Sequence, residues 1–187
     1  MKLFSLGVIL FSLLWLSACT RVPEGVEPVQ NFQLQRYLGH WYEIARLDHS
    51  FERGLTLVTA DYTLNPDGSV AVVNTGYSKA RDAWQLAEGR AEFVGPSDIA
   101  HLKVSFLGPF YSSYIVIDLT DDYQYAMVSG YDKSYLWILS RTPTMPKDVL
   151  EQFIQKAKAL GYPVDQLIFP KQEAQPGNKP SAQSSRE

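Results

Sequence analysis

The stretch GHWYEIARL, residues 39–47, is the part of the sequence that decides the fold. Its aromatic and branched side chains favour a β-strand over residues 41–46. Successive side chains of a strand point to opposite faces, so Glu43 is expected on the same inward face as Trp41. A buried carboxyl group can be catalytic, but we interpret Glu43 as a hydrogen-bonded structural residue.

Short alternating runs of apolar and polar residues follow, separated by Gly, Pro, Asn and Asp. In the clearest run, residues 58–64, every second residue is apolar, which is typical of an antiparallel strand with one buried face. The sequence predicts eight strands, at residues 41–46, 56–64, 70–77, 84–93, 101–106, 113–119, 123–130 and 135–140. Eight sequential strands with short links predict an all-β fold, an antiparallel up-and-down barrel whose closure leaves no exposed edges.

The links between these strands are of two kinds. The second, fourth and sixth links are tight polar turns, NPDG at 65–68, GPSD at 95–98 and TDD at 120–122. Successive links of a meander alternate between the two ends of the barrel, so these three turns lie at one end. The remaining links are longer on average and rich in aromatic residues, so we expect the open mouth of the barrel at the other end. The predicted ligand contacts are Tyr77, Trp84, Phe110, Tyr111, Tyr114, Tyr131 and Tyr135. The alternative, in which these aromatics only pack the loops, remains open.

Small side chains on one predicted strand indicate a cavity inside the barrel. Ala87, Gly89 and Ala91 alternate with larger and charged residues, so the face without charges is lined by small groups. An eight-stranded barrel has an interior just large enough for side chains or one small ligand. Small inward residues leave space, and the sequence therefore predicts a cavity beneath the aromatic mouth.

One helix is predicted after the last strand. Apolar residues recur with helical spacing from Val149 to Leu160, behind Thr144 as N-cap and Pro146 in the first turn, and Gly161 is expected at the C-terminal cap. Its apolar stripe needs a surface, so we expect the helix to pack outside the barrel. Residues 167–169 are apolar and predict a short strand or edge segment.

The two ends of the chain have different compositions from the domain. Lys2 followed by the apolar run of residues 3–16 predicts a signal peptide at residues 1–18, because a membrane-spanning helix needs roughly 20 apolar residues. The sequence LSAC at residues 16–19 resembles the lipobox of bacterial lipoproteins, which implies removal of residues 1–18 and N-acyl and S-diacylglycerol groups on Cys19. The alternative is an ordinary signal-peptide cleavage, with Cys19 as an unmodified cysteine. Residues 19–32 are expected to form a tether and residues 171–187 a disordered tail.

Composition excludes several classes of function. The net charge of −3 gives no basic footprint for nucleic acid, and the length suits one domain, predicted over residues 33–170. With Cys19 acylated, no thiol remains for a disulfide, a metal or a nucleophile. The histidines are scattered and no hydrolase or zinc-binding spacing occurs, so we predict no catalytic residue, no metal site and no cofactor.

Three motifs in order resemble the signatures of the lipocalins. They are GHWYE at residues 39–43, TDDYQYAMV at 120–128 and YLWILSRTP at 135–143. The resemblance covers residues 33–170 and is greatest to the bacterial lipoprotein lipocalins grouped with apolipoprotein D. It implies that Gly39, Trp41, Tyr123 and Arg141 close the base of the barrel, with Arg141 packed across Trp41. The motif contains a second aspartate, and whether Asp121 or Asp122 takes the family position is open.

The resemblance also implies a function, which is binding of a small hydrophobic ligand inside the barrel. Fatty acids or lysophospholipids are the expected partners, held beside the outer membrane through acylated Cys19, for lipid storage, transport or repair in the bacterial envelope. A tetrapyrrole or an isoprenoid as ligand, a lipocalin-fold enzyme, and a barrel filled by side chains are the alternatives. A homodimer is possible on this sequence but not required by it.

Overall fold

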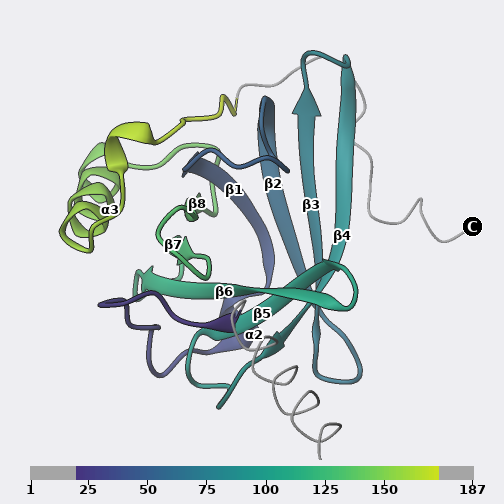
Figure 1. Cartoon of the computed structure of the whole chain (residues 1–187), viewed down its shortest axis with the longest axis vertical. Helices are drawn as coiled ribbons and strands as arrows, with labels where there is room; N and C mark the ends of the chain where they lie inside the picture. Colours follow the sequence, from purple (N-terminus) through teal and green to yellow (C-terminus); the bar gives the residue numbers. More distant parts are fainter. Residues whose placement is uncertain (1–19, 173–187) are drawn as a thin grey trace, which may run out of the picture.

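The computed structural model describes residues 20–172 and contains a closed antiparallel barrel of eight strands (Figure 1). Each strand pairs with the next along the chain, and β1 pairs with β8 to close the ring. The strands are β1 (Gly39–Arg46), β2 (Leu55–Leu64), β3 (Val70–Ser78), β4 (Ala83–Phe93), β5 (His101–Leu107), β6 (Phe110–Leu119), β7 (Tyr125–Ser129) and β8 (Leu136–Ser140). All eight predicted strands are present, so the predicted up-and-down barrel is confirmed.

The turn between β2 and β3 shows why the links at the base can be short. Gly68 adopts a φ of +85°, a left-handed conformation that favours glycine. The Asp67 carboxylate accepts hydrogen bonds from the Ser69 backbone N–H at 3.0 Å and from its hydroxyl at 2.6 Å. The polar residues of the turn therefore satisfy its own backbone, and the strands on either side can pair without a longer loop.

The predicted helix is α3 (Lys147–Ala159), which packs outside the barrel as expected (Figure 1). Phe153 and Ala157 of this helix are buried in one apolar cluster with Ile115 of β6 and Ile138 of β8, so the helix covers these two strands. Two short helical segments were not predicted, α2 (Leu34–Tyr37) before the barrel and the 3-10 helix η2 (Val164–Gln166) after α3. Each is too short to produce a readable helical period in the sequence.

The prediction for the ends of α3 is correct at the C-terminus and wrong at the N-terminus. Gly161 follows the helix with a φ of +84°, which confirms its predicted place at the C-terminal cap. Thr144 is not the N-cap, because Pro146 occupies that position and makes no side-chain capping bond. The carbonyl oxygen of Thr144 instead accepts hydrogen bonds from the hydroxyls of Ser140 and Thr142, which tie the segment before the helix to the end of β8.

The described part of the predicted tether packs against the barrel. Val26 and Phe32 are buried, with 6% and 4% of their surfaces exposed. The Val29 backbone donates to the carbonyl oxygen of Val116, and the Ala100 N–H donates to the carbonyl oxygen of Val29. The described part of the predicted tether, residues 20–32, therefore runs beside β6 and the residues that lead into β5.

The chain after η2 fills a gap between β1 and β2. Ile168 forms a bridge with Arg46 of β1, which confirms the predicted edge segment, and the Leu57 N–H of β2 donates to the carbonyl oxygen of Lys171 at 2.9 Å. Direct pairing of β1 with β2 ends at Tyr42 and Thr59, so these later residues supply the missing backbone partners. Lys171, the first residue of the predicted tail, therefore has a backbone partner in β2.

Several predictions concern residues outside the described range. The signal peptide at residues 1–18, the acylated Cys19 and the tail beyond residue 172 all lie there. Within residues 20–172, no helix is long and apolar enough to cross a bilayer.

The base of the barrel is closed by Arg141, as the resemblance implied. Its guanidinium carbon lies 3.9 Å from the centroid of the fully buried Trp41 ring. Its N–H groups donate to the carbonyl oxygens of Arg36 at 2.7 Å, His40 at 2.9 Å and Tyr123 at 3.3 Å. One side chain therefore joins the end of β8 to α2, to β1 and to the turn between β6 and β7.

In that turn the two aspartates have different structural roles. The Asp122 carboxylate accepts hydrogen bonds from the Thr120 hydroxyl at 2.6 Å and from the Gln124 N–H at 3.1 Å, so it holds the turn together. Asp121 contributes its backbone carbonyl oxygen, which accepts from Arg36 at 2.7 Å. The hydroxyl oxygen of Tyr123 accepts the Gln33 N–H, which fastens the turn to the segment entering the barrel.

Replacing Arg141 by methionine should destabilise the fold. The variant loses the contact with Trp41 and leaves backbone carbonyl groups without their charged donor, so the free energy of unfolding should fall by about 2–4 kcal/mol. Urea unfolding monitored by tryptophan fluorescence measures this change. Arg90→Met is the matched control, since Arg90 is an exposed arginine paired with Asp67 and Glu92 and its loss should cost much less than that of Arg141. Equal losses in the two variants would contradict the role of Arg141.

Candidate functional site

A cavity of about 520 Å³ lies inside the barrel toward the mouth end. Five of the seven predicted ligand contacts line it: Phe110, Tyr111, Tyr114, Tyr131 and Tyr135. Phe51 of the loop between β1 and β2 and Trp137 of β8 line it as well. The predicted cavity is therefore present, with most of the predicted aromatics around it.

Tyr77 and Trp84 are corrections to this prediction, because neither lines the cavity. They face each other across β3 and β4, with ring centroids 5.5 Å apart, and the Tyr77 hydroxyl donates to Asp82. Their neighbours Gly76 and Gln85 line the cavity instead. Since β3 and β4 continue to Ser78 and Ala83, strand alternation turns the two aromatics away from the interior.

The small residues of β4 have the predicted inward placement. Ala87 lines the main cavity, and Ala91 lines a small apolar void of about 20 Å³ nearer the base. At Gly89 an added Cβ atom would lie 2.8 Å from ring carbons of Phe106. The Phe106 ring therefore uses the room that the glycine leaves, and the remaining space above it belongs to the cavity.

Tyr114 belongs to the floor of the cavity and not to its rim, where the prediction placed it. Its hydroxyl group shares hydrogen bonds with those of Tyr37 at 2.7 Å and Tyr62 at 2.9 Å. The Tyr37 and Tyr62 rings are stacked with centroids 5.7 Å apart. Burial raises the pKa of all three phenols above the ordinary range, so the floor is polar and uncharged.

The rim of the cavity is apolar and exposed. Phe51 and Phe110 line the cavity with 57% and 75% of their surfaces exposed, and Leu107 in the adjoining hairpin is 76% exposed. Pairing of β4 with β5 ends at Arg90 and Ser105, whereas β3 and β4 stay paired to their ends. Figure 1 shows β3 and β4 extending away from β5 and β6, so these two pairs of strands diverge toward the mouth.

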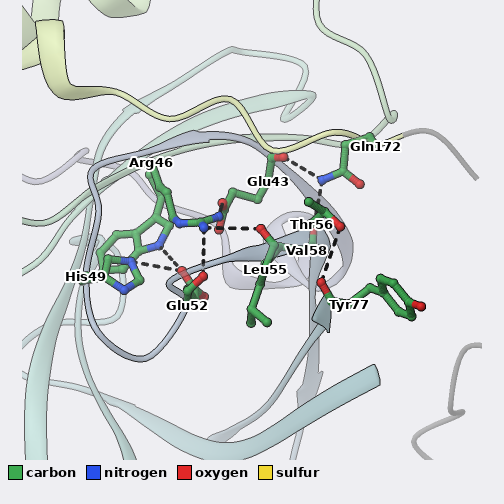
Figure 2. Close-up of polar contacts among 10 residues, drawn as sticks. Glu43, Arg46, His49, Glu52, Leu55, Thr56, Val58, Tyr77 and Gln172 are labelled. Carbon is green, nitrogen blue, oxygen red and sulfur yellow. Dashed lines mark hydrogen bonds and ion pairs between the residues drawn. The ribbon is translucent and has the colours of Figure 1, made fainter. Parts of the chain in front are cut away.

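A buried charge cluster forms another wall of the cavity (Figure 2). Arg46 donates to the Glu43 carboxylate at 2.5 Å and to the backbone carbonyl oxygens of Glu52 and Leu55 at 2.8 and 3.4 Å. The Glu52 carboxylate accepts the Trp137 indole N–H at 3.0 Å and lies 3.0 Å from Nε2 of His49. The prediction that Glu43 is buried, inward and hydrogen-bonded is confirmed.

The two carboxyl groups of this cluster titrate differently. Burial, together with the charge of Glu52, raises the pKa of Glu43 to about 8 against the opposing effect of Arg46. Burial also acts to raise the pKa of Glu52, but His49, the Trp137 N–H and Arg46 outweigh it and lower that pKa below its ordinary value. Burial therefore favours the protonated form of Glu43, whereas the neighbours of Glu52 favour its ionised form.

The C-terminal residue of the described chain completes this wall. The side-chain amide of Gln172 donates to the carbonyl oxygens of Glu43 at 2.7 Å and Val58 at 2.9 Å (Figure 2). Sequence patterns missed Gln172, Glu52 and His49, because they lie in segments without strand or helix periodicity. The signal that could have found His49 and Glu52 is Phe51, an aromatic residue between them in the link after the first predicted strand.

Metal-binding geometry is not found in the described range. Residues 20–172 contain no group of three His, Cys, Asp or Glu side chains placed to hold a metal ion.

A closed eight-stranded barrel with an arginine across its base tryptophan and a cavity at the other end defines a lipocalin. The family model of the lipocalin-like domain matches residues 32–172, and the chain belongs to this family. It is 51% identical over 159 residues to the Outer membrane lipoprotein Blc of Vibrio cholerae, covering 84% of this chain and 93% of that protein. It is 53% identical over 150 residues to the Blc lipoprotein of Citrobacter freundii, covering 80% of this chain and 85% of that protein.

A solved structure supports the fold independently. Insecticyanin from the tobacco hornworm Manduca sexta superimposes with a TM-score of 0.65 at 21% identity, covering 81% of this chain and 86% of that one. The chain therefore shares the lipocalin fold well beyond the range of close sequence similarity.

The raised pKa of Glu43 should make the stability of the fold depend on pH. The folded state holds this proton more tightly than the unfolded chain, whose carboxyl group has a pKa near 4.5, so the contribution is fully present below that pH and is lost as the pH rises through about 8. Glu43→Gln carries no such proton. Between about pH 5 and pH 8 the wild type should lose stability relative to this variant by up to about 1.4 kcal/mol per pH unit.

Thermal unfolding of both proteins across this pH range measures the difference. Glu151→Gln on the exposed face of α3 is the matched control and should follow the wild-type curve. Parallel curves for the wild type and Glu43→Gln would show that Glu43 titrates as an ordinary carboxyl group.

Proposed function

We propose that this chain binds one single-chain lipid, a fatty acid or a lysophospholipid, in the barrel cavity, and that it acts in lipid storage, transport or repair in the bacterial envelope. The observation that carries the proposal is the cavity of about 520 Å³ beneath an apolar rim. Sites for small molecules have volumes of roughly 300–1,000 Å³ and walls that are mainly apolar. An acyl chain in such a site gains roughly 0.8 kcal/mol for each buried CH₂ group.

Attachment at the outer membrane is part of the same proposal. The relatives named Outer membrane lipoprotein Blc support it, as does the lipobox that ends at Cys19. Arg21 donates to the carbonyl oxygen of Tyr131, which lines the cavity, and its own carbonyl oxygen accepts from Ser113. An anchor two residues before Arg21 would thus hold the mouth close to the membrane surface, with the exposed Phe110 and Leu107 on the mouth hairpin.

The direct test is to extract the protein from membranes under mild conditions and to weigh it by native mass spectrometry. A bound fatty acid or lysophospholipid is the expected result, and intact acyl groups on Cys19 should add to the mass of the chain. A co-purifying tetrapyrrole or isoprenoid would contradict the proposed ligand class. Hydrolysis of an added lysophospholipid would support the enzyme alternative.

Filling the cavity should abolish this binding without unfolding the protein. Ala87→Phe places a ring in the space that Ala87 leaves, so the affinity for palmitate and for a palmitoyl lysophospholipid should fall at least about tenfold. Titration followed by tryptophan fluorescence measures the affinity, because Trp137 lines the cavity. Ala83→Phe, at the exposed start of β4, is the matched control. Unchanged affinity in Ala87→Phe would place the ligand elsewhere.

A further inference from the structure

The charged side chains that line the cavity are all acidic. Glu43 and Glu52 line it, and among the described lining residues there is no lysine, arginine or histidine. Arg46 and His49 lie behind the two carboxyl groups and do not reach the cavity wall. A ligand inside the barrel can therefore contact the two acidic side chains directly, whereas these side chains separate it from Arg46 and His49.

A neutral hydrogen-bond acceptor on another strand also favours a ligand that donates hydrogen bonds. Asn74 of β3 lines the cavity, and its buried side-chain oxygen has no hydrogen-bond partner within the described part of the chain. A buried acceptor without a donor is costly, and a ligand that supplies an N–H or O–H group removes that cost. Hydroxyl groups at the floor can donate, but they are neutral and do not offset the carboxyl groups.

Three elements bring charged or titratable groups to the Glu43–Glu52 pair. Arg46 of β1 faces Glu43, His49 and the backbone of the β1–β2 loop surround Glu52, and Tyr62 of β2 lies within electrostatic reach of Glu52. Burial favours the protonated form of Glu43 although Arg46 lies beside it, so the pair holds a proton that a cation could displace. A cation delivered by a ligand would take the place of that proton.

We infer that Glu43 and Glu52 form the polar subsite of the cavity and bind the ammonium group of an amphiphile in exchange for the proton held by Glu43. The inference rests on the proposed function and specifies its ligand class, an acyl or alkyl chain with a positively charged amine end. The proton passes to the solvent, the ammonium group keeps its own protons, and the net charge of the cluster is unchanged. A free carboxylate is the least favoured end group, because it would face two acidic side chains in a desolvated site.

The test compares dodecylamine, dodecanol and dodecanoate, which share one chain and differ in end group. Isothermal titration calorimetry at about pH 7 should give an affinity for dodecylamine at least about tenfold above that for dodecanoate, with dodecanol between them. Repeating the dodecylamine titration in buffers of different ionisation enthalpy should show release of up to about one proton per ligand, because a primary amine is already fully charged at this pH.

Variants locate the effect on the two carboxyl groups. Glu43→Gln should abolish proton release, and Glu52→Gln should reduce the ratio of amine to acid affinity at least about fivefold, whereas the exposed control Glu151→Gln should change neither. A lipid pair of equal chain length, lysophosphatidylethanolamine and lysophosphatidic acid, tests whether an ammonium group in a lipid head group reaches the same subsite. The former should bind more tightly.

The outcomes separate this inference from the proposed function. If dodecanoate binds as tightly as dodecylamine, or if dodecylamine binds without proton release, the inference is wrong while the cavity still binds lipids. If none of the three ligands binds, the proposed function itself fails. The wild-type series decides both questions even where a glutamine variant does not fold.

Discussion

The contact between Arg141 and Trp41 is the constraint on which the rest of the barrel depends. An antiparallel meander becomes a barrel only if its first and last strands meet, and Arg141 leaves β8 to lie across the buried ring of β1. Its hydrogen bonds to the carbonyl oxygens of Arg36, His40 and Tyr123 add α2 and the β6–β7 turn to the same junction. With one end fixed in this way, the other end can remain open without loss of closure.

The open end is a consequence of strand pairs that diverge toward the mouth. Pairing stops at Tyr42 for β1 with β2 and at Arg90 for β4 with β5. Where β1 and β2 separate, their unpaired backbone groups form hydrogen bonds with residues 168–172. Where β4 and β5 separate, the Phe106 ring fills the space over Gly89. The cavity therefore exists because the interior widens where the sheet is no longer continuous, and small residues such as Ala87 keep it from being filled.

Sequence patterns predicted the regular part of this molecule well. Alternation gave the eight strands, the turn chemistry identified the base, and the motif resemblance placed Arg141 over Trp41. The mistakes at the mouth arise because aromatic residues at the ends of predicted strands are counted with the adjoining loops. Tyr77 and Trp84 belong to strands and face outward, whereas Tyr114 lies well inside β6 and faces the floor. Glu52 and Gln172 could not be placed at all, because only the folded chain brings their segments to β1.

The buried charges connect this irregular part to the ligand site. An ion pair away from water is costly, and well-packed apolar residues often serve stability equally well. Arg46, however, also donates to the backbone of Glu52 and Leu55, so the arginine behind Glu43 fixes the loop that carries Phe51 to the rim. A group that changes the charge on Glu43 thereby changes the strength with which Arg46 holds the loop. If a ligand displaces the proton of Glu43 as proposed, its chemistry and the order of the mouth are linked through Arg46, a connection that an apolar wall would not provide.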